Sequence, residues 1–279
     1  MDADRVKRYF PEVDVIKVYP DSGQKAVFLI EHPKHGKVIL KIIRDMNERI
    51  LREIELATNQ QLRNIPKIYE VATFLADTEE HSYFIEQYIS GNSLRSEIDN
   101  QKFNTERSLA LLESLLKTAI ELEKANVVHR DIKPDNVICS DNDEFFLIDF
   151  GIARMLNKKS LTITNAAVGP HTPGYGAPEL FQYSKSNITI KADLFSIGVV
   201  VYESMFGKHP FITGNEHDIN EVWYRTATAV PLDINIVGDD DRKLMGFLQT
   251  LMNKHISRRP PTAQKALDWF YIVKESVQI

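Results

Sequence analysis

A short polar segment near the middle of the chain carries the residue types that phosphoryl transfer needs. Residues 129–136 read HRDIKPDN, and an apolar strand-like run at 145–148 then leads into residues 149–151, which read DFG. A loop and a turn thus bring two acids, a lysine and an asparagine to one place. One carboxylate can take the proton of an incoming hydroxyl, and the other, with the amide oxygen of the asparagine, can bind Mg²⁺. The lysine can stabilise the negative charge of the transferred phosphate. We therefore expect a phosphoryl-transfer site here.

The two segments resemble the catalytic loop and the metal-binding turn of protein kinases. The resemblance implies that Asp131 accepts or orients the proton of a substrate hydroxyl, and that Lys133 steadies the transferred charge. It also implies that Asn136 and Asp149 bind two Mg²⁺ ions. Lys133 is the neighbour expected of kinases that act on Ser and Thr. The alternative is that both acids are capping or turn carboxylates, which the complete string and its spacing disfavour.

The first third of the chain reads as strands, because β-branched residues alternate through residues 13–43. We expect an antiparallel meander of strands at 13–19, 26–30 and 37–43. Lys41 lies in the third strand and resembles the lysine that grips nucleotide phosphates, although a solvated outward-facing lysine is the alternative. Apolar spacing predicts a helix over 47–62. Glu53 lies on its buried side, so the resemblance makes Glu53 the partner of Lys41.

The turn at residues 20–25, PDSGQK, lies where a kinase has its glycine-rich phosphate loop. Counting back from Val27, the three glycine places hold Pro20, Ser22 and Lys25, and the one glycine is Gly23. We expect Ser22, Gly23, Lys25 and Val27 to bind the nucleotide, with Lys25 supplying charge in place of backbone amides. A plain hairpin turn is the alternative.

Residues 83–89, YFIEQYI, read as a strand that resembles the segment between kinase lobes, where the backbone binds adenine. The match places Gln87, Tyr88 and Ile89 in this segment and Glu86 at the back of the nucleotide pocket. That place is more often apolar, so we expect Glu86 to pair with a nearby group or water. An ordinary core strand is the alternative reading.

Residues 149–179 resemble an activation segment that ends in the Ala-Pro-Glu motif. Thr172 matches the threonine that touches the catalytic acid and lysine, and Glu179 is expected to pair with Arg259. An arginine before the catalytic acid, here Arg130, implies control by phosphorylation. The candidate acceptors are Ser160, Thr162 and Thr164, with Arg154 as a second phosphate ligand. A merely polar loop is the alternative.

Further patterns predict the helices of the second half. We expect a helix over 105–125, capped by Asn104 or Thr105, and a central buried helix at 193–203 that ends near Gly207. The resemblance implies that Asp193 binds the backbone of the catalytic loop. The acids at 239–241 precede a helix and suit its positive end better than a metal. Trp269 and Phe270 are expected in the core of a final helix.

The composition fits a globular protein of the reducing cytosol. The chain has 279 residues, of which 43% are hydrophobic, and one cysteine, Cys139, in an apolar stretch. A formal charge of −5 gives no case for nucleic-acid binding. The charged start indicates no signal peptide, and the longest apolar run is too short for a bilayer. We expect a cytoplasmic protein that binds no membrane; its oligomeric state stays open.

The resemblance covers about residues 13–275 and implies an α+β, two-lobed protein-kinase fold. An N-lobe with a small antiparallel sheet and one regulatory helix is expected over 1–89, and a larger, mainly helical C-lobe over 90–279. The implied function is ATP- and Mg²⁺-dependent phosphorylation of Ser and Thr in protein substrates, including the enzyme itself. One alternative is a pseudokinase, favoured only by the glycine-poor loop and Glu86. A kinase of small molecules is another, and Arg130 and residues 172–179 oppose it.

Overall fold

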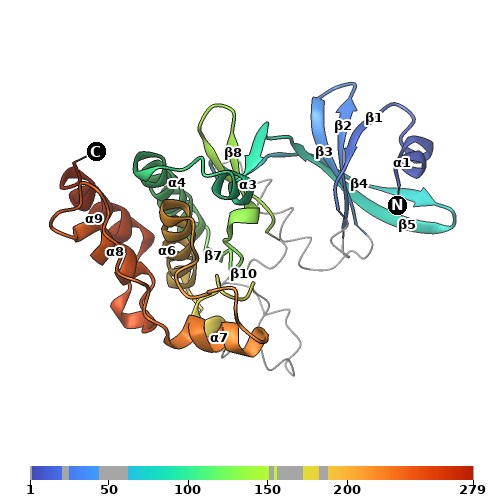
Figure 1. The fold of residues 1–279 in the computed structure, drawn as a ribbon. Coiled ribbons are helices and arrows are strands. Elements are labelled where there is room, and N and C mark those ends of the chain that lie inside the picture. Colours follow the sequence, from blue (N-terminus) through green and yellow to red (C-terminus); the bar gives the residue numbers. More distant parts are fainter. Residues whose placement is uncertain are drawn as a thin grey trace. The chain divides into compact units, whose positions relative to one another are not determined.

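Two compact units make up the chain, residues 1–90 and 91–279 (Figure 1). The structure is a computed structural model, and it describes residues 2–20, 25–43, 62–150, 154–155, 172–181 and 188–278, with only the backbone for 154–155.

The first unit is built on one five-stranded antiparallel sheet with strand order β1-β2-β3-β5-β4. The three expected strands at its start are confirmed, as is the strand expected over 83–89, which runs from Glu79 to Gln87. The elements are α1 (Ala3–Tyr9), β1 (Asp14–Val18), β2 (Lys25–His32), β3 (Gly36–Ile43), β4 (Ile68–Ala76) and β5 (Glu79–Gln87).

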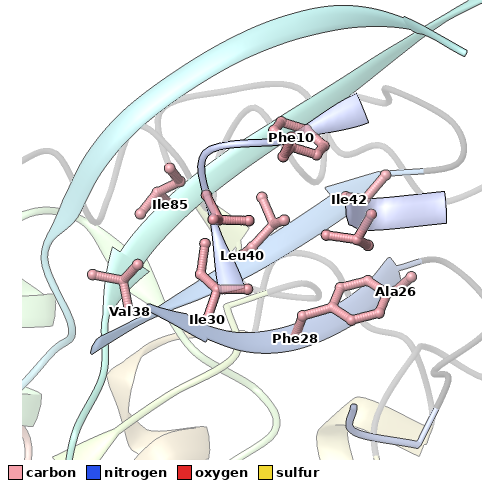
Figure 2. Packing of buried hydrophobic residues seen from close by; sticks show 10 residues of the cluster. Phe10, Ala26, Phe28, Ile30, Val38, Leu40, Ile42 and Ile85 are labelled. Atoms are coloured by element: carbon pink, nitrogen blue, oxygen red, sulfur yellow. The ribbon is translucent and has the colours of Figure 1, made fainter. Parts of the chain in front are cut away.

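The core of the first unit lies between one face of this sheet and the N-terminal segment (Figure 2). Successive strand residues point to opposite faces, so Phe28, Leu40 and Ile85 share this face from three different strands. Phe10, just after α1, packs against them from outside the sheet. The apolar members of this cluster are Val6, Phe10, Val13, Ala26, Phe28, Ile30, Val38, Leu40, Ile42 and Ile85.

Sequence reasoning missed α1, although local signals for it are present. The Asp2 side chain caps the helix by accepting from the Arg5 backbone N–H at 2.9 Å. Tyr9 then fixes the helix to the β4–β5 turn, because its hydroxyl donates to the Asp77 carboxylate at 2.9 Å. Val6 and Phe10, four residues apart, mark the buried side.

The second unit is mainly helical, with two small sheets of order β6-β8-β9 and β10-β7. Its strands are β6 (Gly91–Ser93), β7 (Val127–Val128), β8 (Val137–Ser140), β9 (Phe145–Leu147) and β10 (Arg154–Met155). Its helices are α3 (Leu94–Asp99), α4 (Thr105–Lys124), α5 (Pro178–Phe181), α6 (Ile190–Phe206), α7 (Ile219–Thr228), α8 (Lys243–Leu251) and α9 (Ala263–Glu275), with 3₁₀ turns at Pro134–Asn136 and Ile256–Arg258.

Helix α6 is the centre of this unit, and it packs against α4 and α8 (Figure 1). It is apolar around most of its circumference, as expected of a helix buried on all sides. The helix ends as predicted at Gly207, whose φ of 63° is left-handed and therefore suits glycine. This rigid helix carries Asp193 in its first turn.

Sequence signals also placed the flanking helices correctly. Asn104 caps α4, with its side chain accepting from the Arg107 N–H at 2.8 Å. Asp239 accepts from the backbone of Leu244 and Met245 at the start of α8, which is the expected use of an acid at a helix N-terminus.

Trp269 and Phe270 of the final helix were both predicted to lie in the core, and the prediction is correct for one of them. Phe270 is fully buried in α9, as predicted. The prediction for Trp269 was wrong, because this residue is 41% exposed, although its ring packs against Phe247 in a T-shaped arrangement. Over all the described ranges, the helices are too short or too polar to cross a membrane.

Candidate active site

Asp193 of α6 holds the polar loop at residues 129–136 through hydrogen bonds to the loop backbone. One carboxylate oxygen accepts from the His129 N–H at 2.8 Å and the other from the Arg130 N–H at 2.9 Å, as predicted. Asp193 is fully buried, and burial raises its pKa to about 7, while the two backbone hydrogen bonds oppose that rise. The loop is thereby fixed to α6, and Arg130 adopts a φ of 70°.

The His129 ring links this loop to the turn that carries Asp149. Its Nδ1 accepts from the Asp131 N–H at 3.2 Å, so Nε2 must carry the proton, and it lies 3.3 Å from the Ile148 carbonyl oxygen. The ring also packs edge-on against Phe150 at 4.5 Å between centroids. Loop and turn are therefore held in a fixed relation by one buried side chain.

The Asp131 carboxylate is oriented by neighbours from two separate segments. The Thr172 hydroxyl donates to Oδ1 at 2.5 Å, and the Asn136 amide nitrogen donates to Oδ2 at 3.0 Å. Lys133 Nζ lies 3.5 Å from Oδ2 and donates to the Thr172 oxygen at 3.0 Å. The predicted loop residues and Thr172 thus meet in one cluster, with Asp131 at its centre.

Asn136 and Asp149, the two expected metal ligands, are tied together by the backbone. The Ile148 N–H donates to the Asn136 carbonyl at 2.9 Å, which places the residue before Asp149 beside Asn136. The Asn136 amide nitrogen donates to both the backbone and the side chain of Asp131, so its amide oxygen is the atom suited to a cation. Asp149 has a left-handed φ of 62° at the start of the turn.

Thr172 is positioned by a network that sequence reasoning did not identify. The Tyr175 hydroxyl donates to Glu203 at 2.7 Å and accepts from Arg95 at 2.5 Å, while Arg95 also donates to Glu203 at 3.0 Å. The Ser196 hydroxyl donates to the Tyr175 carbonyl at 2.9 Å. Burial and the Glu203 charge raise the pKa of Tyr175, so the hydroxyl stays protonated and can donate. These bonds hold the segment after Thr172 on α6.

Gly174 in the same segment is favoured by its backbone conformation. Its φ is +90°, which side chains other than glycine rarely adopt, and an added Cβ would also press on the end of the Ile212 side chain. The end of the segment is fixed by the predicted pair of Glu179 with Arg259, which is confirmed. It is bidentate at 2.6 and 2.9 Å, and both side chains are almost fully buried.

The first unit carries the other expected site residues on the sheet face opposite to Phe28. Lys41 lies in β3, and its Nζ is 2.7 Å from Glu86 Oε1 on β5, with both side chains about nine-tenths buried. Lys25, at the start of β2, is also buried, and Val27 follows it on the same face. The group expected beside Glu86 is therefore identified as the Lys41 ammonium.

Residues 87–89, expected to lie beside the adenine ring, form the end of β5 and the segment after it. The Gln87 N–H donates at 2.8 Å to the carbonyl of Lys67, the residue before β4 begins. Tyr88 and Ile89 come next and are half-buried. Several predicted residues lie outside the described part of the chain, namely Ser22, Gly23, Glu53, Ser160, Thr162 and Thr164; the Arg154 side chain is likewise not described.

Comparison with known proteins agrees with this fold. The family model for the protein kinase domain matches residues 26–272, so the chain belongs to the protein kinase domain family. An antiparallel-sheet unit followed by a helical unit is the two-lobed fold that the sequence predicted.

Curated bacterial relatives carry serine/threonine kinase names. The probable serine/threonine-protein kinase pknA2 of Bifidobacterium longum is 27% identical over 222 residues, covering 79% of this chain and 28% of the relative. The kinase PrkC of Bacillus subtilis is 28% identical over 214 residues, covering 74% and 32%. The kinase pkn2 of Myxococcus xanthus is 26% identical over 269 residues, covering 91% and 31%. The chain thus spans about a third of the length of these relatives.

Proposed function

We propose that this chain is an ATP-dependent protein kinase that transfers the γ-phosphate to Ser and Thr hydroxyls of protein substrates. The observation that carries the proposal is the cluster of Asp131, Lys133, Asn136 and Thr172, built from two segments around one carboxylate. Phosphoryl transfer depends on positioning and charge stabilisation more than on covalent chemistry, and this cluster supplies both.

Asp131 has the role of receiving or orienting the substrate hydroxyl proton. Its two oxygens accept from Thr172 and Asn136, so the direction of the carboxylate is fixed before a substrate arrives. Lys133 lies within 3.5 Å of the same carboxylate, where its positive charge can stabilise the phosphate that is transferred.

Asn136 and Asp149 have the role of holding Mg²⁺. An amide oxygen and a carboxylate are the hard oxygen donors that this ion prefers, and the hydrogen bonds of Asn136 leave its oxygen for that task. Mg²⁺, when bound, neutralises the negative charge of the nucleotide phosphates. The protein contributes the fixed positions of the two donors.

Lys41 and its neighbours support the proposal that residues of the first unit bind ATP. Lys41 and Lys25 place two ammonium groups on one sheet face, which favours phosphate. Ser22, Gly23 and Val27 belong to the loop and strand over the phosphates, and Glu53 is the proposed helix partner of Lys41. The backbone around Tyr88 and Ile89, with Glu86 behind it, is proposed to receive the adenine ring.

Protein Ser and Thr residues are the proposed substrates, and autophosphorylation is proposed at Ser160, Thr162 or Thr164. Support comes from Lys133 and Thr172, which meet at Asp131 as the resemblance to Ser/Thr kinases implies. The names of the relatives point the same way.

Asp131→Asn tests this proposal, because Asn keeps the shape but accepts no proton. We expect phosphate incorporation from labelled ATP into a generic protein such as casein, or into the chain itself, to fall about 10²–10⁴-fold. Asp143→Asn is the matched control, since Asp143 is exposed in the β8–β9 turn and its φ of 57° also suits Asn. A wild-type chain that incorporates no phosphate with Mg²⁺ present would support the pseudokinase alternative instead.

A further inference from the structure

One face of the first sheet buries three charged side chains from three strands. Lys25 is 5% exposed, and Lys41 and Glu86 are each 8% exposed. Lys25 opposes Ile43 and Val27 opposes Lys41 in the β2–β3 register, so the two lysines are diagonal neighbours on one face. The charges of these three side chains sum to one excess positive charge.

The centre of this cluster is the ring of Phe84. Lys41 opposes Phe84 in the β3–β5 register, and its Nζ lies 5.4 Å from the ring centroid. The Lys25 Nζ lies 6.0 Å from the same centroid. Two buried ammonium groups near one ring repel each other, so a nearby carboxylate is needed to keep either charge inside the protein.

Glu86 provides that carboxylate from within the sheet. It is 2.7 Å from Lys41 and two residues beyond Phe84, and the backbone pairing of β3 with β5 fixes both Cα positions. Ile43 and Phe84 form an apolar cluster on this face, so packing alone would favour an apolar residue at position 86. A buried Glu that contacts a functional lysine therefore points to a role beyond packing.

We propose that Glu86 is a positioning residue, whose carboxylate holds the Lys41 ammonium charged and oriented for the nucleotide phosphates. The proposal rests on the assignment of Lys41 to ATP. It holds whether or not a helix carboxylate also reaches Lys41, because β5 itself supplies the contact. Glu86 touches the lysine and acts through it.

The reactivity of the Lys41 amine tests this contact without any phosphoryl transfer. Glu86→Gln removes the negative charge but keeps the shape, so the buried ammonium becomes easier to deprotonate. We expect trace acetylation by acetic anhydride near pH 8, quantified by mass spectrometry, to rise about three- to tenfold at Lys41. Lys37, exposed on the same strand, is the internal control and should not change. Equal labelling of Lys41 in both proteins would overturn the proposal.

Kinetics then test the consequence for ATP. We expect Glu86→Gln to lower kcat/KM for ATP about tenfold, since a misdirected ammonium loses a charge-assisted hydrogen bond to phosphate. Glu86→Asp keeps the charge and should recover part of that loss. Glu80→Gln is the matched control on the same strand, where Glu80 is exposed and accepts from Thr73. A Glu86→Gln protein as active as wild type, or more active, would contradict a positioning role.

A stability cycle covers the case in which a single variant folds poorly. Lys41→Met leaves the Glu86 carboxylate buried beside an apolar side chain, whereas Lys41→Met with Glu86→Leu removes both charges. We expect Glu86→Leu to raise the urea concentration at the unfolding midpoint more in the Lys41→Met protein than in the wild type, where it removes the carboxylate beside the Lys41 ammonium. Equal effects of Glu86→Leu in the two proteins would show that the two side chains are not coupled. If the labelling and the cycle succeed while no variant transfers phosphate, the contact stands and the kinase assignment fails.

Discussion

The Thr172 hydroxyl touches both charged partners of the catalytic loop, because it donates to Asp131 at 2.5 Å and accepts from Lys133 at 3.0 Å. One hydroxyl therefore sets the separation of the acid and the lysine. Its loss would leave only the direct contact of 3.5 Å between them.

Replacing Thr172 separates this role from simple folding. We expect Thr172→Ala to lower kcat about tenfold, because a hydrogen bond to a charged group contributes about 1.5–3 kcal/mol. The KM for ATP should change less than about twofold, since the contacts of Thr172 are with the loop and not with Lys41. Steady-state kinetics with a protein substrate measure both constants. Thr172→Ser keeps the hydroxyl and should retain most of the activity; equal losses in the two variants would count against this explanation.

At the scale of single residues, the sequence predicted which residues form the site, but it did not predict every contact between them. Asp131, Lys133 and Asn136 are close in sequence, so their string already indicated one site. The pair of Lys41 with Glu86 depends on the register of β3 against β5, which are separated by more than a whole strand. Register over such a distance is set by the packing of the whole sheet and not by local sequence.

At the scale of elements, helices α4 and α9 are joined on their exposed sides by Glu113. Its carboxylate accepts from Lys117 at 2.8 Å on its own helix, and from Tyr271 at 3.1 Å and Lys274 at 2.8 Å on α9. Partial burial disfavours its charge, but the hydrogen bonds and charges of the two lysines outweigh this and lower its pKa to about 2. The folded state thus binds this proton less readily than the unfolded state.

This difference predicts a pH-dependent contribution to stability. A carboxylate with a lowered pKa stabilises the fold above its unfolded value near 4.5, and the contribution is lost as pH falls towards 2. We expect Glu113→Gln to reduce the free energy of unfolding by about 1 kcal/mol at pH 7, since both lysines are half-exposed and screened. The difference from wild type should shrink steadily from pH 5 to pH 3.

Urea unfolding at several pH values measures this profile. Asp268→Asn on α9 is the control, because it makes the same change in charge at an exposed pair with Lys265. A difference between Glu113→Gln and wild type that stays constant from pH 7 to pH 3 would rule out the ion pairs as its source.

Most elements were predictable because their signals are local. Alternation gave the strands, and an Asn at position 104 with apolar spacing placed the start and length of α4. Helix α1 was missed because it has only seven residues, too few for a clear period. The exposure of Trp269 was missed because the helical pattern alone does not show how far a neighbouring helix covers it.

At the scale of the whole molecule, the N-terminal segment with α1 covers one side of the hydrophobic core of the first unit. Phe10 packs on Phe74 and Tyr83 at centroid distances of 4.8 and 4.9 Å and is 6% exposed. We expect Phe10→Ala to destabilise this unit by about 3–5 kcal/mol, which is typical of a large-to-small change in a core. Hydrogen exchange of the β2 and β3 amides reports this unit alone, and it should become faster.

Tyr9→Phe is the companion variant for this prediction. It keeps the ring but removes the exposed hydrogen bond to Asp77, so exchange in β2 and β3 should remain close to wild type. Unchanged exchange in Phe10→Ala would mean that the sheet holds its core without the N-terminal segment.

The burial of Cys139 has a practical consequence for labelling this chain at chosen positions. The chain has one cysteine, it is 3% exposed in β8, and burial raises its pKa to about 12, so near neutral pH it is an enclosed thiol. Thiol-directed dyes or spin labels react through the thiolate at accessible sites. A new cysteine placed on the surface of each unit would therefore carry the only reporters, and the native sequence needs no replacement for distance measurements between the units in solution.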